Sequence, residues 1–281
     1  MNAPTSPLVF GPYDQAALDL QYNNRARCPD AATYMARFPQ SSARVRAELG
    51  GELDLAYGPG PRDRLDLFRP IGVKNPPVVI FIHGGYWHLL DKQVFGYLAR
   101  PWVRAGAAFA ALGYPLCPEV TMTDLVASVR AGIAWLAAEA GSLGLDRGRM
   151  LVTGHSAGGH LTAMSATGPG PDLVGAVALS GLYDLEPIQL TYLNASLRMS
   201  PDEAKALSPI HLPKPGARAG RVILNVGSAE SEEYHRHQDA LGATWDVETR
   251  SLAGLHHFSI VDTLADQGHP LFRTVAELLR L

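Results

Sequence analysis

The residues best suited to covalent chemistry form a short glycine-rich segment, GHSAG at 154–158. The segment fits the pattern G-x-S-x-G. It follows an apolar run at 150–153 and precedes a helical pattern at 157–166. A serine on a sharp turn between a strand and a helix needs small neighbours, because the backbone there is strained and closely packed. Such a turn raises the hydroxyl above the sheet, so we expect Ser156 to be the nucleophile of an acyl transfer rather than an incidental turn residue.

A second glycine-rich segment, HGGYW at 83–87, directly follows an apolar run at 78–82. Glycines let the backbone turn its N–H groups toward one point, because no Cβ stands in the way. We therefore expect the backbone N–H groups of Gly85 and Tyr86, together with that of Ala157, to form an oxyanion hole. The alternative is that the segment is a turn without a catalytic role, in which the side chain of His83 supports the backbone.

A nucleophilic serine of this kind requires a carboxylate and a histidine, in the chain order serine, acid, histidine. Glu230 follows the apolar run at 222–226, where a carboxylate could orient the base. Glu232 and Glu233 are the fallback acids, and Asp184 is a weaker one. The alternative role for Glu230 is to complement the dipole of the helix that follows it.

Two adjacent histidines, His256 and His257, follow the last expected strand, and only one of them can face the serine. The residues alone leave that choice open. His235 and His237 lie on an expected helix, where a spacing of two places side chains about 200° apart, unlike the i,i+4 pair of a zinc motif. We expect no metal. Because no phosphate-binding or dinucleotide-binding motif occurs, we also expect no cofactor.

The hydrophobic pattern predicts the elements that would position these residues. Alternation on both sides of a Gly-Pro-Gly-Pro turn is typical of an antiparallel hairpin, short apolar runs are typical of buried strands, and apolar spacings of three and four indicate helices. Strands are expected at 53–57, 64–68, 78–82, 107–112, 150–153, 176–179, 222–226 and 247–252, and helices at 43–49, 93–105, 120–140, 157–166, 232–241 and 270–279. This order predicts an α/β fold with a mostly parallel eight-stranded sheet and helices on both faces.

The length of 281 residues allows up to about two domains, but we expect a single α/β domain over 1–281. Residues 1–50 would form an N-terminal cap. The proline-rich stretch 185–220 lacks strong strand patterns and would be an insertion over the active site. Trp87 and Tyr192, with the histidine that does not serve as base, are candidates for the substrate pocket, since such pockets are mostly apolar and aromatic.

The composition excludes some classes of binding partner. A net charge of −3 gives no basic surface for nucleic acid, and no stretch is apolar for long enough to cross a membrane. The two cysteines fit no metal or redox spacing, and the N-terminus does not read as a secretory signal. We expect a cytoplasmic protein that acts on a small molecule. A homodimer is plausible but has no sequence signature.

Five separated segments resemble one family. In chain order they are HGGYW, GHSAGGHL, SGLYDLEPI, VGSAESEEYHRHQ and HHFSIVDTL, and they resemble the arylformamidase (kynurenine formamidase) branch of the α/β-hydrolases, which is related to the hormone-sensitive-lipase-type esterases. The resemblance spans about 53–264 and implies the α/β-hydrolase fold, with Ser156 as nucleophile. The histidine directly before phenylalanine matches the base, which selects His257 and leaves His256 as pocket lining; a lipase-type motif would select His256.

The family usually has an aspartate at the position of Glu230. The stretch YNNR at 22–25 matches the family only loosely and is a further candidate for shaping the pocket. The resemblance implies a serine hydrolase that cleaves an aryl formamide such as N-formylkynurenine, in tryptophan catabolism. A carboxylesterase for short-chain or aryl esters is the alternative, since both run the same acyl transfer. A catalytically inactive hydrolase fold that serves as a binding module is the alternative of another class.

Overall fold

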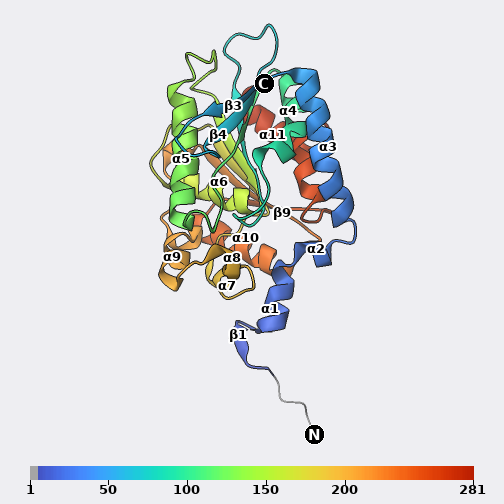
Figure 1. The fold of residues 1–281 in the computed structure, drawn as a ribbon, viewed down its shortest axis with the longest axis vertical. Coiled ribbons are helices and arrows are strands. Elements are labelled where there is room, and N and C mark those ends of the chain that lie inside the picture. The colour runs from blue at the N-terminus through green and yellow to red at the C-terminus, as the bar shows by residue number, and fades with distance from the viewer. Residues whose placement is uncertain (1–5) are drawn as a thin grey trace.

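The computed structural model describes residues 6–281, and a sheet of eight strands runs through its centre (Figure 1). The strand order is β10-β9-β8-β7-β5-β6-β4-β3. The strands are β3 (Glu52–Ala56), β4 (Arg64–Phe68), β5 (Val78–Ile82), β6 (Ala108–Leu112), β7 (Met150–His155), β8 (Gly175–Leu179), β9 (Arg221–Gly227) and β10 (Glu248–Leu252). Strand β4 pairs antiparallel with β3 and β6, and the other pairs are parallel. The predicted mostly parallel eight-stranded sheet is confirmed.

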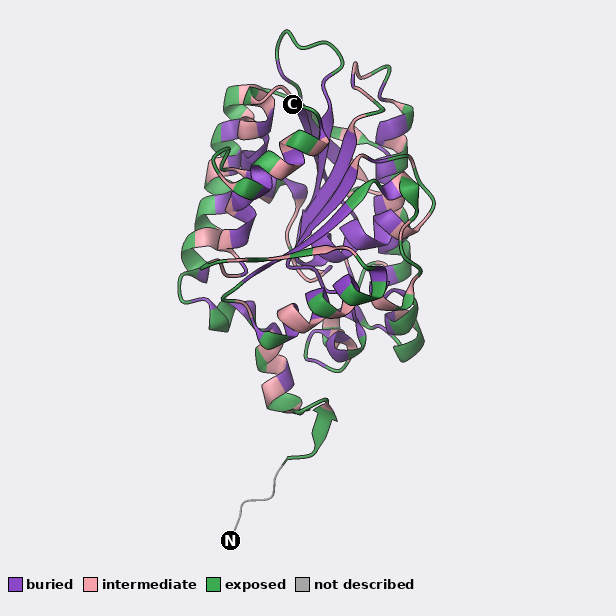
Figure 2. Cartoon of the chain, turned by 180° about the vertical axis from the view of Figure 1, so that it is seen from behind, coloured by how far each residue is buried: buried purple, intermediate pink, exposed green. Residues whose placement is uncertain are grey.

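Helices cover both faces of the sheet (Figure 1). The helices α5, α6 and α10 pack on one face, and α3, α4 and α11 pack on the other. Their bounds are α3 (Ala31–Leu49), α4 (Ala99–Arg104), α5 (Met122–Ala138), α6 (Ala157–Thr167), α10 (Glu232–Trp245) and α11 (Pro270–Leu278). Figure 2 shows the strands at the centre of the sheet as buried. A strand covered on both sides has no solvent-facing positions, which explains the continuous apolar runs in the sequence.

Strand β5 illustrates how one strand serves two cores. Val78, Ile80 and Ile82 belong to the core under α5 and α6, whereas Val79 and Phe81 belong to the core under α3, α4 and α11. Successive side chains of a strand point to opposite faces, so each face receives every second residue. All five residues are at most 1% exposed. The strand therefore fixes the start of the HGGYW loop from both sides.

Two expected helices differ from the observed ones. The stretch 93–105 is a 3₁₀ helix, η1 (Lys92–Leu98), followed by α4. Pro101, the third residue of α4, has no N–H to donate to the carbonyl four residues earlier, so an α-helical hydrogen bond between η1 and α4 is missing at this point. The helix expected at 43–49 is the end of the much longer α3, which contains Pro39.

The N-terminal segment begins with a small two-stranded sheet, β1 (Leu8–Phe10) and β2 (Tyr13–Asp14), which continues into α1 (Gln15–Tyr22) and α2 (Asn24–Arg27). The stretch 185–220 folds into α7 (Glu186–Gln189), α8 (Asn194–Leu197), α9 (Pro201–Ala206), η2 (Pro209–His211) and η3 (Ala217–Ala219), with no strand among them. In Figure 1 helices α1, α2 and α7 to α9 lie at the same end of the molecule. The single-domain assignment for 1–281, with a cap and an insertion, stays a prediction; residues 1–5 lie outside the described residues.

The last short element is η4 (Ser259–Leu264), which follows the two adjacent histidines. Across residues 6–281, no helix combines the length and the apolar character needed to span a bilayer.

Candidate active site

Ser156 lies on the turn between β7 and α6 and is 3% exposed. Its backbone has φ 58° and ψ −118°, a conformation that costs a residue with a Cβ about 1–3 kcal/mol. The surrounding chain holds this turn: the Ser156 N–H donates to the Leu179 carbonyl at 2.8 Å, and the Ser156 carbonyl accepts from the His160 N–H at 3.1 Å. The strained strand-to-helix turn expected for a nucleophilic serine is therefore present.

Glycine is required beside this turn for a steric reason. A Cβ on Gly158 would collide with the carbonyl oxygen of Ile82, at the end of β5. Helix α6 can therefore start directly against the strand that leads into the HGGYW loop. A Cβ on Gly84 would lie 3.1 Å from the Cβ of Ser156, so this loop passes directly beside the serine.

The loop that follows β5 turns sharply, with positive φ at successive residues. Gly85 has φ 112°, and a Cβ there would collide with the Leu89 carbonyl. Tyr86 also has positive φ, at 46°. Within residues 6–281, the backbone N–H groups of Gly85, Tyr86 and Ala157 have no acceptor in the protein. Free N–H groups on the two glycine-rich turns can therefore stabilise an oxyanion formed at Ser156.

His257 is paired with Glu230. The Nδ1 atom of His257 lies 2.7 Å from Glu230 Oε2, and the two side chains are 6% and 1% exposed. The other carboxylate oxygen, Oε1, accepts from the Ser180 hydroxyl at 2.6 Å and from the Gly227 N–H at 2.7 Å. Three partners thus fix the carboxylate, which can hold the imidazole with its proton on Nδ1 and leave Nε2 free to act as a base.

The other acids considered from the sequence have different partners. Glu233 accepts from the Tyr22 hydroxyl at 2.7 Å and pairs with Arg236, whose guanidinium also pairs with Asp184 at 2.9 Å. Glu232 is exposed and accepts from the hydroxyl of a tyrosine near the N-terminus. Of the acids proposed from the sequence, the structure brings Glu230 to His257.

His256 does not line the cavity, contrary to expectation. Its Nε2 lies 3.2 Å from a carboxylate oxygen of Asp30, and its ring packs edge-on against Tyr34, with 5.3 Å between centroids. Its Nδ1 accepts from the backbone N–H groups of Phe258 and Ser259. The two histidines are adjacent in the chain but point to different surroundings, and His257 lies on the cavity.

A cavity of about 350 Å³ opens over Ser156 and His257. Tyr192 from the insertion lines it, as expected, and so does the stretch 22–25 of the N-terminal segment. The remaining walls are mainly apolar and come from the segment after β5, η1, α3, the insertion and the residue after His257: Met35, Phe38, Leu89, Leu90, Val94, Phe95, Leu193 and Phe258. The site is therefore a largely apolar pocket with Ser156 at its base.

Trp87 does not line the cavity either, which corrects the prediction for this residue. It is fully buried, and its indole Nε1 donates to His160 Nδ1 at 3.2 Å. The positive φ of 59° at Trp87 turns the side chain toward α6 rather than toward the cavity. The tryptophan thus packs the oxyanion loop onto the helix that starts after Ser156.

A network of hydroxyl groups, not anticipated from the sequence, braces the oxyanion loop. The Tyr86 hydroxyl donates to the Tyr22 carbonyl at 2.7 Å and lies 2.9 Å from the Tyr234 hydroxyl. The side-chain amide of the buried Asn24 donates to both hydroxyls, at 3.0 Å and 2.8 Å. The Tyr234 ring in turn packs against His257, with 4.7 Å between centroids. The N-terminal segment thus contacts both the HGGYW loop and Tyr234, which packs against His257.

Asn24→Ala should lower the free energy of unfolding by about 1–3 kcal/mol, because a buried donor to two hydroxyl groups is lost. Asn24 and Tyr86 share a hydrogen bond, so their contributions to stability should be coupled. In a double-mutant cycle of Asn24→Ala with Tyr86→Phe, we expect an interaction energy of about 1 kcal/mol. Urea denaturation of the four proteins measures both quantities. Strictly additive losses would contradict the proposed bracing of the loop.

Three buried histidines surround the site and are neutral near pH 7. Burial lowers the pKa of His83 to about 4 and that of His160 to about 4. Burial, with a smaller contribution from His257, holds the pKa of His155 well below its usual range. His155 Nε2 lies 2.7 Å from the His257 carbonyl, so the neutral ring donates a hydrogen bond to the backbone of His257.

These shifts predict acid sensitivity. The folded pKa of His160 is depressed, so the unfolded chain binds a proton near pH 6.5 that the folded chain binds only near pH 4. The stabilisation is fully present above about pH 6.5 and is lost as the pH falls toward 4. Urea denaturation between pH 7.5 and 4 should show a shallower loss of unfolding free energy for His160→Gln than for the wild type. An equal slope would show that His160 does not contribute.

Comparisons with known proteins agree with this geometry. The family model BD-FAE matches residues 65–176. The kynurenine formamidase of Danio rerio is 28% identical, over 93% of this chain and 95% of that protein. A crystal structure from Silicibacter sp. TM1040, provisionally described as a thioesterase, is 31% identical with a TM-score of 0.83, over 92% of this chain and 98% of that one. Esterase B of Lactobacillus rhamnosus, at 19% identity and a TM-score of 0.68 over 91% and 97% of the two chains, shares the fold.

The eight-stranded sheet, the strained serine turn and these neighbours define the chain as an α/β-hydrolase, an enzyme of the serine hydrolase kind. Within that class it belongs to the arylformamidase-like α/β-hydrolases, which act on esters or formamides.

Several residues around the candidate active site were not predicted from the sequence. Ser180 directly follows the expected strand at 176–179, and the carboxyl ends of parallel strands meet at one edge of the sheet, so its place beside Glu230 had a usable signal. His155 could have been suspected from its position next to the serine. Asn24 and Tyr234 are 210 residues apart, and no local pattern signals their contact.

Proposed function

We propose that this protein is an arylformamidase that cleaves an aryl formamide such as N-formylkynurenine, with Ser156, His257 and Glu230 as its catalytic triad. The observation that carries the proposal is the pairing of a buried Glu230–His257 couple and a strained serine on one cavity, in a chain that aligns with kynurenine formamidase over nearly its full length. A formyl group is the smallest acyl group, so little space beside Ser156 suffices for it.

The reaction proceeds in two acyl-transfer steps. His257 Nε2 takes the hydroxyl proton as Ser156 Oγ bonds to the formyl carbon, and Glu230 stabilises the imidazolium. The N–H groups of Gly85, Tyr86 and Ala157 stabilise the oxyanion. The carbon–nitrogen bond then breaks, and the arylamine leaves with the proton from His257. Water, deprotonated by His257, attacks the formyl ester; formate leaves and Ser156 regains its proton.

A carboxylesterase is the second candidate, favoured by the esterase structures that share the fold. The acyl transfer is the same for both substrates, so the substrate pocket must decide between them. Comparing kcat/KM for N-formyl-L-kynurenine with that for p-nitrophenyl acetate tests the proposal. We expect a clear preference for the formamide, at about 10⁴ M⁻¹s⁻¹ or more.

Ester turnover with negligible formamide turnover would contradict the formamidase proposal and favour the esterase. No turnover of either substrate, equal to that of Ser156→Ala, would favour an inactive binding module. A preference for the formamide would also support a role in tryptophan catabolism. Cytoplasmic location and a homodimer stay predictions that these kinetics do not address.

A further inference from the structure

The cavity over Ser156 has an unusual charge distribution. Of the described residues that line it, Arg25 alone carries a permanent charge, and none is an aspartate or glutamate. His88 lies on the same wall, and burial lowers its pKa, which keeps it neutral near pH 7. The permanent charge among the described residues that line this apolar pocket is therefore a single guanidinium; Asp19, which accepts from the Tyr192 N–H at 3.0 Å, is not part of the lining.

Arg25 also has no carboxylate partner in the protein. Within residues 6–281, no aspartate or glutamate oxygen lies within 4.0 Å of its guanidinium nitrogens. Other arginines of the chain are paired, as Arg37 is with Asp262 and Arg62 is with Asp91. A guanidinium without an internal partner keeps its planar set of donors available to a ligand.

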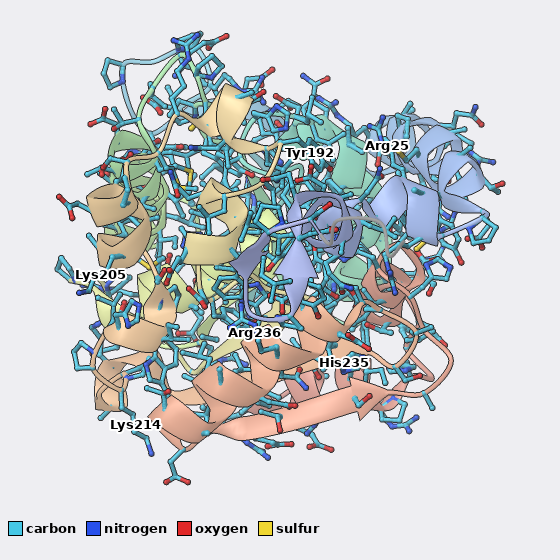
Figure 3. All side chains as sticks on the ribbon, turned by 90° about the horizontal axis from the view of Figure 1, so that it is seen from below. Arg25, Tyr192, Lys205, Lys214, His235 and Arg236 are labelled. Carbon is cyan, nitrogen blue, oxygen red and sulfur yellow. The ribbon has the colours of Figure 1, made fainter. Side chains whose placement is uncertain are left out.

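The position of Arg25 relative to the serine follows from burial. Ser156 is 3% exposed and lies at the base of the cavity, whereas Tyr192 is 48% exposed and Arg25 is exposed, both at its mouth. Figure 3 labels Arg25 and Tyr192 close to each other on the same end of the molecule. A substrate that enters from this mouth and reaches Ser156 with its carbonyl can therefore place its far end beside Tyr192 and Arg25.

We propose that Arg25 binds a carboxylate at the far end of the substrate, so that the enzyme selects anionic aryl formamides or esters over neutral ones. The guanidinium donates two parallel hydrogen bonds to the two carboxylate oxygens, an arrangement that suits this pair of groups. The proposal rests on the proposed function in one respect only, that Ser156 is the group that attacks the substrate.

Matched substrates test this proposal. The aryl esters 4-acetoxybenzoate and 3-(4-acetoxyphenyl)propanoate, each beside its neutral carboxamide, vary charge at two distances from the scissile bond. The formamides 4-formamidobenzoate and 4-formamidobenzamide do the same for the proposed reaction. The measured quantity is the ratio of kcat/KM for the anion to that for its amide. A ratio taken within a pair cancels effects of a variant on the chemical step.

Arg25→Gln should lower this ratio by about threefold to tenfold, between the values typical of an exposed ion pair and of a charge-assisted hydrogen bond. Arg27→Gln is the matched control: Arg27 is exposed on the same helix α2, does not line the cavity, and its loss changes the net charge equally. Arg25→Lys should restore part of the ratio. In the wild type the ratio should also fall as ionic strength rises, because salt screens an exposed pair.

An unchanged ratio in Arg25→Gln, or an equal fall in Arg27→Gln, would overturn the role of Arg25. The two proposals fail separately. If the esters react and the formamides do not, the formamidase proposal fails, and the ester pairs still decide the role of Arg25. If the formamides react with a ratio that Arg25→Gln leaves unaltered, the formamidase proposal stands and the carboxylate site is wrong.

Discussion

Replacing Ser156 by alanine is expected to lower kcat by about three to six orders of magnitude while the fold stays intact, because the hydroxyl is the group that forms the bond to the substrate. The residual rate would come from the oxyanion hole and from binding alone. Steady-state kinetics with the formamide and with an aryl ester measures the loss. Ser142→Ala, at an exposed serine that bonds only within its own turn, is the control and should keep wild-type kinetics.

The same position offers a second readout. Ser156→Gly should be as inactive as Ser156→Ala but more stable by about 1 kcal/mol, since glycine adopts positive φ without steric cost. Thermal or urea denaturation compares the two variants. An active Ser156→Ala enzyme would contradict the assignment of the nucleophile. Equal stability of the two variants would contradict only the strain at this turn.

The second large effect is expected at the base. His257→Ala should lower kcat by about three orders of magnitude or more, because the proton transfers of the acyl-transfer cycle then have no side chain to carry them. Its neighbour supplies the matched control: His256→Ala removes an imidazole that contacts Asp30 and Tyr34 outside the cavity, and kcat should change little. A large loss of kcat in His256→Ala with little change in His257→Ala would select the lipase-type alignment, in which His256 is the base.

Glu230→Gln should also lower kcat, but by less than His257→Ala does. Glutamine cannot stabilise the imidazolium, and it no longer favours the tautomer with the proton on Nδ1 of the neutral ring. The comparison with Glu233→Gln is informative, since Glu233 pairs with Arg236 rather than with the base. Activity retained in Glu230→Gln and lost in Glu233→Gln would show that the acid has been assigned to the wrong residue.

The central elements of this fold could be predicted because their signals are local. The strands that are buried on both faces appear in the sequence as apolar runs, and the glycines around Ser156 are required by close backbone approaches that no other residue allows. The boundary between η1 and α4 could not be read from apolar spacing. Such spacing is nearly the same in both helix types, and the break depends on Pro101.

The candidate site also has some residues that could be predicted from the sequence and others that could not. The chain order and the strand ends made Ser156 and Glu230 candidates, whereas the choice of His257 over His256 came from the resemblance to a known family. The structure places His257 beside Glu230. The surroundings of Trp87 and His256 depend on which way a loop turns, and both predictions for the pocket were wrong. The contacts of Asn24 with the oxyanion loop join distant segments, so only the structure reveals them.

We propose that Ser156 in this cavity carries out the hydrolysis. Labelling the protein with a fluorophosphonate, which reacts with activated serines, tests it directly when peptide mapping and residual kcat are measured on the same samples. We expect a single labelled residue, Ser156, with formamide and ester hydrolysis lost in proportion to the label. Label on another residue, or full activity in protein labelled at Ser156, would contradict it.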